Sequence, residues 1–379
     1  MNAFRDPGDT SVEARYPLDA VRCTTCTLVQ LDHSVPPETL FRDYAYFSSY
    51  SDAFLEHARR FAEVAGRQLG PDGFVVEAAS NDGYLLQYFR QAGNRVLGIE
   101  PARNVAEVAR ARGIATVAEF LDQELARRIV REHGPADLVV ANNVLAHVPD
   151  PNGFVAALAT LADEGGRVSI EVPYVRDMID GVEFDTIYHE HLSYFSLTAL
   201  TQLVERHGAR VVHVERLPVH GGSLRIWLAA SGAPDDAVGE LLEDEARWGI
   251  AEADRYRTFA ERVAGARRGV AEFVAGLCAR GTVAAYGAAA KGVVLANTCS
   301  LDAERVAFAA DRNPHKQGKV FPGVRIPVVP PETLREQRPD YCLLFAWNIA
   351  DEILAQQHGY REAGGRFVVP LPEPTVIAA

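Results

Sequence analysis

A short cluster of ionisable and aromatic side chains, Tyr188-His189-Glu190-His191, stands in a segment rich in His, Tyr and Asp. An imidazole can remove a proton from a substrate near neutral pH, so His191 is our candidate general base. Glu190 can fix the tautomer of that imidazole, and Tyr188 can donate a hydrogen bond to an oxygen that gains negative charge. We expect His189 to contact the substrate. A lone histidine is more often structural, but this grouping favours a catalytic role.

A second group of polar residues lies in the loop 77–83, which reads EAASNDG. The apolar run 73–78 predicts a strand, and 83–92 predicts a helix. In an open α/β sheet, ligands bind beyond the carboxyl ends of the strands. Glu100 ends the next expected strand, where its carboxylate can accept hydrogen bonds from both hydroxyls of a ribose. The candidate cofactor contacts are Glu77, Ser80, Asn81, Asp82, Gly83, Glu100, Asn142 and Asn143.

The composition of this loop distinguishes between two cofactors. A pyrophosphate needs a glycine-rich turn such as GxGxxG at a helix N-terminus, and the loop 77–83 lacks that motif. S-adenosylmethionine has no phosphate and is compatible with the small residues at 78–80. The alternative, that Glu100 only ends a strand in solvent, is weakened because Glu77, Asp82 and Glu100 fall along one expected sheet edge. The loop therefore predicts S-adenosylmethionine as the cofactor.

The elements that must position these residues alternate between strand and helix, which predicts βαβ units and a mostly parallel sheet. We expect an α/β fold with a central Rossmann-like methyltransferase domain and a second, smaller Rossmann-like C-terminal domain. Strands are expected at 73–78, 95–100, 136–141, 166–172, 282–286, 306–310, 341–346 and 366–370, and a helix at 104–112. We divide the chain into an N-terminal segment, a cofactor domain, a helical connection and a C-terminal domain, at 1–60, 61–234, 235–277 and 278–379.

Charge and composition exclude several classes of protein. The chain of 379 residues carries 38 Lys+Arg against 51 Asp+Glu, so nonspecific binding to nucleic acid is not expected. No apolar run approaches the roughly 18 residues of a membrane span, and the first residues do not resemble a signal peptide. Five cysteines in a chain of this length do not indicate a disulfide framework. We expect a cytoplasmic protein, a monomer or weak homo-oligomer, without membrane or nucleic-acid partners.

Two glycine-containing segments carry candidate substrate contacts. Adjacent glycines beside a serine and an arginine allow a sugar or phosphate to approach closely. In the C-terminal part, cations in glycine-containing loops can pair with a diphosphate, although the chain is acidic elsewhere. The candidate substrate contacts are His220, Gly222, Ser223, Arg225, Lys291, His315 and Lys316.

Four stretches of the chain together resemble a known enzyme family. These are 77–89 (EAASNDGYLLQYF), 98–101 (GIEP), 188–191 (YHEH) and 311–319 (DRNPHKQGK). They resemble the nucleotide-sugar C-methyltransferases of antibiotic deoxysugar pathways, which include the tetronitrose and mycarose enzymes. The resemblance covers nearly the whole chain, and YHEH combined with DRNPHKQGK is specific. It implies methylation at C3 of a dTDP-linked 4-keto-deoxyhexose, with the C-terminal domain helping to hold the nucleotide sugar.

The resemblance also implies roles for residues that the pattern alone leaves open. His147 is similar to an additional active-site histidine of the family, and a capping or surface histidine is the alternative. The family places a tyrosine from the aromatic stretch 41–50 over the active site, which makes Tyr44 and Tyr46 candidates, with core packing as the alternative. Ala79 stands where a glycine is common in the family.

An N-terminal zinc-binding segment, a zinc ribbon held by two CxxC pairs, is implied as well. This chain has one pair, Cys23 and Cys26, and two thiolates cannot close a four-coordinate structural site. Because Asn2-Ala3-Phe4 looks like the family's segment just after the first pair, we expect that the chain starts downstream of a lost pair. A zinc-free variant is the alternative.

Forming a carbon–carbon bond at C3 requires a carbon nucleophile, and a C4 keto group lets an enolate form there. Positioning should supply much of the rate, because the methyl sulfonium is already a strong electrophile. Three other functions stay open: methylation at C5 or of another acceptor, a bifunctional methyltransferase and ketoreductase using NADPH at 286–292, and a non-catalytic sugar-nucleotide binder. The last does not explain why a His/Glu/Tyr cluster accompanies a cofactor site.

Overall fold

The computed structural model describes residues 2–36, 40, 47–70 and 72–377, apart from the side chains of Asp163 and His220. Two compact units form, each from separate stretches of the chain. The central unit consists of 19–176 and 190–251, and the C-terminal unit of 1–18, 177–189 and 252–379. Tyr44 and Tyr46 lie outside the described residues.

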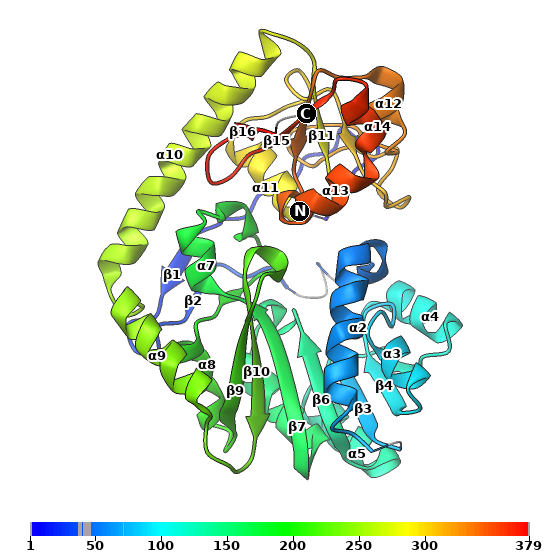
Figure 1. The fold of residues 1–379 in the computed structure, drawn as a ribbon, viewed down its shortest axis with the longest axis vertical. Helices are drawn as coiled ribbons and strands as arrows, with labels where there is room; N and C mark the ends of the chain where they lie inside the picture. The colour runs from blue at the N-terminus through cyan, green and yellow to red at the C-terminus, as the bar shows by residue number, and fades with distance from the viewer. Residues whose placement is uncertain (1, 37–39, 41–46, 71, 378–379) are drawn as a thin grey trace. The chain divides into compact units, whose positions relative to one another are not determined.

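The central unit is built on a sheet with the strand order β5-β4-β3-β6-β7-β10-β9 (Figure 1). The strands β5, β4, β3, β6 and β7 run parallel, and β10 is antiparallel to both of its neighbours. The strands are β3 (Phe74–Ala78), β4 (Arg95–Ile99), β5 (Thr116–Val117), β6 (Ala136–Asn142), β7 (Ala162–Pro173), β9 (Arg210–Leu217) and β10 (Ser223–Ala229). The predicted parallel sheet and its first strands are confirmed.

Helices cover both faces of this sheet because successive residues of a buried strand point to opposite sides. Val75 of β3 packs with Phe61 and Phe89, whereas Val76 packs with Phe154 in a separate core. These aromatic residues come from α2, α3 and α6. The helices of the unit are α2 (Asp52–Gly66), α3 (Leu86–Gln91), α4 (Arg103–Ala111), α5 (Gln123–His133), α6 (Pro151–Leu161), α8 (Leu197–Glu205) and α9 (Asp236–Trp248).

A small antiparallel sheet in the same unit carries the cysteine pair. The strands β1 (Ala20–Arg22) and β2 (Val29–Leu31) form a hairpin, and β8 (Ser193–Tyr194) pairs with β2. Cys23 and Cys26 lie in the turn of this hairpin. Because β8 directly follows 188–191, this sheet anchors one end of the predicted catalytic segment.

The C-terminal unit contains a second doubly wound sheet, with the order β13-β12-β11-β14-β15-β16. All neighbours run parallel except β16, which is antiparallel. Its strands are β11 (Val283–Tyr286), β12 (Ala309–Ala310), β13 (Val328–Val329), β14 (Tyr341–Leu344), β15 (Arg366–Val369) and β16 (Thr375–Val376). Its longer helices are α10 (Ala253–Cys278), α11 (Ala290–Thr298), α12 (Thr333–Gln337), α13 (Ala350–Gln356) and α14 (His358–Glu362).

Two details differ from the pattern read from the sequence. The strand expected at 306–310 is limited to Ala309–Ala310, although Val306 and Phe308 are buried. The expected connection 235–277 is not one body, because α9 belongs to the central unit and α10 to the C-terminal unit. The segment 177–189 also joins the C-terminal unit, where Val182 and Phe184 enter its core.

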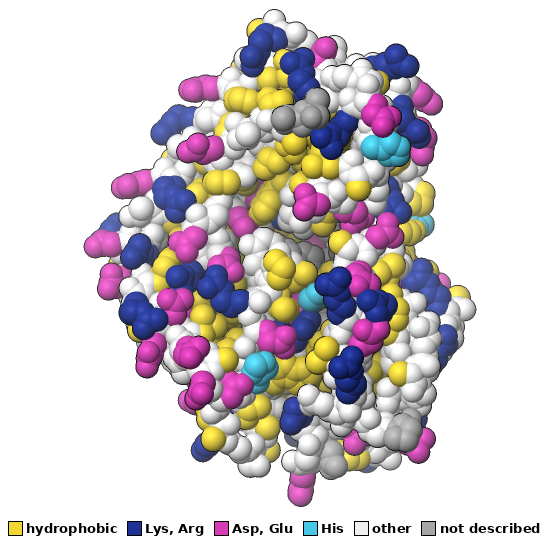
Figure 2. All heavy atoms as spheres, viewed as in Figure 1, with side chains coloured by type: hydrophobic (Ala, Val, Ile, Leu, Met, Phe, Trp, Pro, Cys, Tyr) yellow, Lys and Arg dark blue, Asp and Glu magenta, His cyan; other side chains and the backbone are white. Residues whose placement is uncertain are grey.

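Short elements complete the described chain: α7 (Val175–Asp180) and the 3-10 turns η1 (Ser48–Tyr50), η2 (Leu145–His147), η3 (Phe184–Thr186), η4 (Val219–Gly221) and η5 (Trp347–Ile349). Among the described residues, no helix combines the length and the apolar character needed to cross a membrane. Positive and negative side chains are interspersed over the face drawn in Figure 2, so the acidic excess is not gathered into one patch there.

Candidate active site

The predicted cofactor loop makes a tight path at the carboxyl end of β3. Ala79, Asn81 and Gly83 all have positive φ, at 54°, 48° and 78°. A Cβ on Gly98 of the neighbouring strand would lie 2.3 Å from the Ser80 Oγ, so the loop lies directly against β4. Ala79 occupies a backbone conformation that costs an L-residue about 1–2 kcal/mol, which is a physical reason for a glycine to be common there.

Glu100 follows β4 and holds this loop from the side. The backbone amide of Asn81 donates to one carboxylate oxygen at 3.0 Å, and that of Ala102 donates to the other at 2.8 Å. Each oxygen keeps a further lone pair, so two ribose hydroxyls can still be accepted. Burial raises the pKa of Glu100 to about 7, although the two amides oppose the shift.

Several buried acceptor atoms around this loop have no hydrogen-bond partner among the described residues. Buried polar groups in folded proteins are nearly always paired, so these atoms indicate a ligand that supplies donors. S-adenosylmethionine carries two ribose hydroxyls, an ammonium group and a positive sulfonium, and it fits such a set. Burial raises the pKa of Glu77 well above its ordinary value. The nearby Tyr84 hydroxyl opposes this shift, and the Glu100 carboxylate adds to it. The atoms are both carboxylate oxygens of Glu77, the Ser80 Oγ, the Asp82 Oδ1 and the Asn142 Oδ1.

Two of the predicted cofactor residues are partly engaged by η1. The Asn81 Oδ1 accepts a hydrogen bond of 2.8 Å from the backbone amide of Ser48. The Asp82 Oδ2 forms an ion pair of 2.9 Å with Arg112 and accepts a hydrogen bond from the Ser49 hydroxyl. These contacts fix the loop, and they leave the other Asp82 oxygen for a ligand.

The loop after β6 brings two predicted catalytic histidines together. The rings of His147 and His191 meet edge to face, with centroids 4.7 Å apart. The amide of Leu192 donates to the Ala146 carbonyl at 2.7 Å, which ties the two segments together. Burial lowers the pKa of His147 to about 4, so its ring is neutral at physiological pH. The ring of Tyr194 lies 6.2 Å from that of His191.

The motif Tyr188-His189-Glu190-His191 is divided between the two units. Glu190 and His191 belong to the central unit, where Glu190 is buried. Tyr188 and His189 belong to the C-terminal unit, where the His189 Nε2 lies 2.8 Å from the Pro17 carbonyl oxygen. The structure therefore supports a direct pairing of His191 with His147, and His189 makes a structural contact within its own unit.

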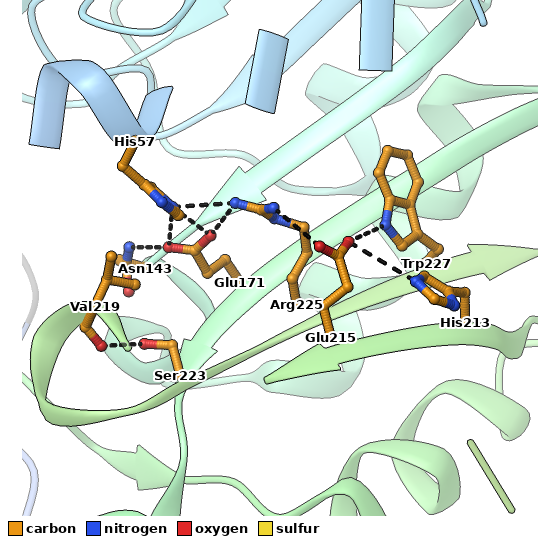
Figure 3. A network of polar contacts seen from close by, with 9 residues as sticks. All are labelled: His57, Asn143, Glu171, His213, Glu215, Val219, Ser223, Arg225 and Trp227. Atoms are coloured by element: carbon orange, nitrogen blue, oxygen red, sulfur yellow. Dashed lines mark hydrogen bonds and ion pairs between the residues drawn. The ribbon is translucent and has the colours of Figure 1, made fainter. Parts of the chain in front are cut away.

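A polar network that the sequence did not predict crosses the sheet beside this loop (Figure 3). Glu171 of β7 is fully buried, and its Oε2 lies 2.7 Å from Arg225 Nη2 and 2.9 Å from His57 Nε2. The Asn143 side-chain amide donates to the Glu171 Oε1 at 3.2 Å. A glutamate between Ile170 and Val172 in a buried strand was the available signal. His57 gave none, because a single histidine on an amphipathic helix is usually structural.

The other predicted substrate contacts of the central unit lie where β10 begins. Gly222 has a φ of 129°, and its carbonyl accepts a hydrogen bond of 2.9 Å from the amide of Tyr174. The Ser223 hydroxyl donates to the Val219 carbonyl at 3.1 Å. Arg225 is engaged by Glu171, which leaves less of its guanidinium for a substrate. The side chain of His220 lies outside the described residues.

The predicted cations of the C-terminal unit differ in what they contact. Lys316 is buried, and its ammonium donates to the Ala288 carbonyl at 2.8 Å. The ammonium of Lys291 is buried without a hydrogen-bond partner in the described chain, and it lies 4.2 Å from the Trp347 ring centre. Burial lowers the pKa of Lys291, whereas the Asp185 carboxylate opposes that shift. His315 is exposed.

Comparison with known proteins places this site in a family. Residues 218–372 match the model of a "C-methyltransferase C-terminal domain", and residues 49–214 match that of a "Methyltransferase domain". C-methyltransferase NovU of Streptomyces niveus is 42% identical over 384 residues, which span 100% of this chain and 91% of that protein. The chain belongs to the C-methyltransferase family. It is therefore an enzyme that uses S-adenosylmethionine, which supplies an electrophilic methyl group when bound.

Other comparisons match only part of the chain. A ubiquinone biosynthesis O-methyltransferase of Ralstonia nicotianae is 32% identical over 116 residues, covering 30% of this chain and 46% of that protein. A solved structure of magnesium protoporphyrin IX methyltransferase from Synechocystis, with bound S-adenosylmethionine, is 16% identical with a TM-score of 0.36. It covers 47% of this chain and 78% of that one.

Residues 1–41 match a model described as "Putative zinc binding domain". Backbone hydrogen bonds to Cys26 and Thr25 lower the pKa of the Cys23 thiol to about 7, which favours the thiolate that metals bind. However, no group of three or more metal-ligating side chains occurs in the described part of the chain. The residues described therefore do not complete a four-coordinate zinc site, and zinc binding stays a prediction.

Proposed function

We propose that this enzyme transfers a methyl group from S-adenosylmethionine to C3 of a dTDP-linked 4-keto-deoxyhexose, in the biosynthesis of an antibiotic deoxysugar. Membership of the C-methyltransferase family supports carbon as the methyl acceptor. The resemblance of 188–191 and 311–319 to the nucleotide-sugar enzymes supports the acceptor class. The C4 keto group makes the reaction possible, because it acidifies the proton at C3.

The proposed reaction begins with removal of the C3 proton by His191. The electron pair of the C–H bond moves towards C4, and negative charge develops on the C4 oxygen. The resulting carbon nucleophile takes the methyl group, and S-adenosylhomocysteine leaves. The edge-to-face pair of His147 and His191 carries this assignment, because a neutral His147 does not oppose positive charge on His191.

Other groups are assigned by their chemistry. Tyr188 is proposed to donate to the C4 oxygen, and Glu190 to favour the required tautomer of His191. Tyr44 and Tyr46 stay candidates for a tyrosine over the sugar. For the substrate, Gly222 and Ser223 stay proposed contacts of the sugar.

The nucleotide end of the substrate is assigned to the C-terminal unit. Lys291 is the favoured contact for the diphosphate, because its buried ammonium has no hydrogen-bond partner in the described chain. The exposed His315 is a second candidate. Lys316 is less suited, since its ammonium already bonds the Ala288 carbonyl.

One position after β11 weakens the alternative of an NADPH-dependent reductase. Gly287 and Gly292 stand where GxGxxG has its first and third glycines, but Ala289 replaces the second, which lets the backbone approach a pyrophosphate. Methylation at C5 uses the same chemistry, because C5 also adjoins the C4 keto group. The product therefore decides between C3 and C5.

The test is incubation with dTDP-4-keto-deoxysugars and S-adenosylmethionine carrying a ¹³C-labelled methyl group, with NMR of the product. We expect the label on C3. Replacing His191 with asparagine should lower turnover by roughly 10²–10⁴-fold, the usual contribution of a general base, while calorimetry still detects cofactor binding. H133N, on an exposed histidine of the same unit, should stay within about twofold of wild type. Unchanged turnover in H191N would remove His191 as the base.

A further inference from the structure

We propose that Glu171 is a positioning residue for methyl transfer, which holds Asn143 and, through it, the pair of His147 and His191. The proposal rests on the proposed function, in which His191 is the base. Every contact that carries it lies within the central unit. The site of action is the carboxyl end of β6, between the cofactor loop and the predicted catalytic segment.

The burial of Glu171 is the first argument. An ionised carboxylate inside a protein costs several kcal/mol unless it is paired, and an apolar residue would pack the strand without that cost. Glu171 is completely buried, and its carboxylate is paired with Arg225 at 2.7 Å and His57 at 2.9 Å. Arg225 also lies over the Phe61 ring at 4.4 Å, so the cation itself is fixed. Such a costly cluster indicates a role beyond packing.

The backbone of Asn143 is the second argument. Its φ is 53°, in the left-handed region that residues other than glycine seldom occupy. Two hydrogen bonds to the same residue stabilise this conformation. The Asn143 amide donates to the Glu171 carbonyl at 2.7 Å, and its side chain donates to the Glu171 carboxylate at 3.2 Å. Strained residues of this kind persist only where their surroundings determine them, and they concentrate at functional sites.

The path from Asn143 to the base is the third argument. The turn η2 begins two residues later and ends at His147. The His147 amide closes this turn on the Val144 carbonyl at 2.8 Å, and the Leu192 amide bonds the Ala146 carbonyl at 2.7 Å. The His147 ring meets His191 edge to face at 4.7 Å. A shift of Asn143 is therefore transmitted to the ring that packs against the proposed base.

The experiment compares the same isosteric change at two glutamates that face Arg225, which are Glu171 and Glu215. Glu215 of β9 also faces Arg225, at 3.6 Å, and accepts a hydrogen bond from Trp227, but no contact links it to Asn143 among the described residues. E171Q should lower kcat by roughly 10–100-fold with little change in the KM for S-adenosylmethionine, because small displacements of reacting groups cost that much. E215Q should keep kcat within about twofold. Equal losses in both variants would overturn the proposal.

Asn143 supplies a second test that does not require E171Q to fold. Glycine adopts positive φ freely, so N143G removes the side-chain contact without straining the loop. We expect N143G to lower kcat about as much as E171Q, and E171Q to add little in the N143G background. Additive losses in the double variant would mean that Glu171 acts by another route.

A spectroscopic readout separates this proposal from the proposed function. In protein with ¹⁵N-labelled histidine, NMR signals of the His147 and His191 rings can be assigned with H147N and H191N. E171Q should shift both signals, and E215Q should leave them in place. Unshifted signals in E171Q would overturn the positioning role, even if H191N abolishes turnover. Shifted signals together with an active H191N would instead leave Glu171 as a positioning residue and remove His191 as the base.

Discussion

The two parallel sheets of this protein repeat one construction at their carboxyl edges. In both, the strand order around the first strand is the same, and an acidic residue follows the second strand. Glu100 accepts the backbone amides of Asn81 and Ala102. Asp311 accepts those of Ala288 at 2.5 Å and Asn313 at 2.8 Å. In each unit, the acid therefore ties the loop after the first strand to the end of the second.

The two edges differ in the polar groups that stay unpaired. Beside Glu100, the unpaired atoms are acceptors, such as the carboxylate oxygens of Glu77. In the second unit, the buried groups without a hydrogen-bond partner among the described residues include the Tyr286 hydroxyl and a cation, Lys291. Burial lowers the pKa of Lys291, and the carboxylates of Asp185 and Glu183 oppose that shift. A donor-rich, positively charged cofactor matches the first edge. The second edge already contains counter-charges, so an anion bound there competes with them.

Strand order alone does not determine which sheet binds the cofactor. The chemistry of the loops that follow the strands distinguishes the two sheets. Both sheets provide a switch point, where ligands of doubly wound folds bind. The loop chemistry differs: polar Ser80, Asn81 and Asp82 follow β3, whereas three alanines follow Gly287 after β11. What distinguishes the two edges is the number and the charge of the buried polar groups that have no hydrogen-bond partner among the described residues.

The largest effect that tests this difference is expected at Glu100. E100Q removes the charge that we propose accepts two ribose hydroxyls. Hydrogen bonds to charged groups contribute about 1.5–3 kcal/mol each, so the Kd for S-adenosylmethionine should rise about 100-fold. With a pKa of about 7, Glu100 is protonated at pH 6 and ionised at pH 8. Cofactor binding favours the ionised form and releases this proton, so the wild-type Kd should rise about tenfold from pH 8 to pH 6. In E100Q, calorimetry should detect no such dependence of the Kd on pH.

The equivalent change at the other edge is the control. D311N replaces the same kind of carboxylate, with the same two types of amide contact, in the C-terminal unit. It should leave the Kd for S-adenosylmethionine unchanged. Equal weakening in D311N and E100Q would mean that the affinity responds to stability rather than to the cofactor edge.

A smaller effect, on stability, is expected at Lys291. K291M leaves the buried Asp185 carboxylate with the Trp347 indole, which donates at 2.7 Å, and without its nearby cation. A buried carboxylate that loses a nearby positive charge is destabilised even without a direct ion pair, so urea unfolding should show a loss of about 2 kcal/mol in the free energy of unfolding. Because Lys291 stacks on Trp347, tryptophan fluorescence should report the change.

Two further variants test why K291M loses stability. The double variant K291M/D185N should recover about half of that loss, because the amide needs no counter-charge. K316M removes a lysine whose ammonium bonds the Ala288 carbonyl and lies over the Phe4 ring, and should cost about 1 kcal/mol. If K291M lowers the free energy of unfolding no more than K316M does, the carboxylates of Asp185 and Glu183 do not depend on Lys291. The contrast between the two edges would then fail.

Much of the scaffold was predictable because local patterns determine it. Apolar runs predicted β3, β4, β6 and β14 to within a few residues. The division into units was not, because 177–189 leaves the central unit through tertiary packing of Val182 and Phe184. For the same reason the motif at 188–191 read as one cluster, although its two halves lie in different units.

The candidate site was predictable where its residues end strands and not where they meet across strands. Glu100 and Asn143 were predicted as site residues because strand ends in a parallel sheet share one edge, and the structure describes both at the ends of their strands. Glu171 and His57 are 114 positions apart, and only the sheet and α2 bring them together. No periodicity in one chain encodes such a pairing. The sequence signal was limited to a carboxylate in a buried strand.

The smallest effect on stability is expected at the first residue after β3 and after β11, where the two edges also differ. The second edge has Gly287, with a φ of 99°, and the first has Ala79, with a φ of 54°. A79G should relieve the left-handed strain of about 1–2 kcal/mol, but the unfolded chain gains about 0.5–1 kcal/mol of entropy. We expect a net stabilisation below about 1 kcal/mol and an unchanged Kd for S-adenosylmethionine, measured by thermal unfolding and calorimetry. A156G, within α6, should destabilise by up to about 1 kcal/mol. A loss of stability in A79G would show that the alanine methyl group packs favourably, and the absence of a glycine at position 79 would then reflect packing rather than tolerated strain.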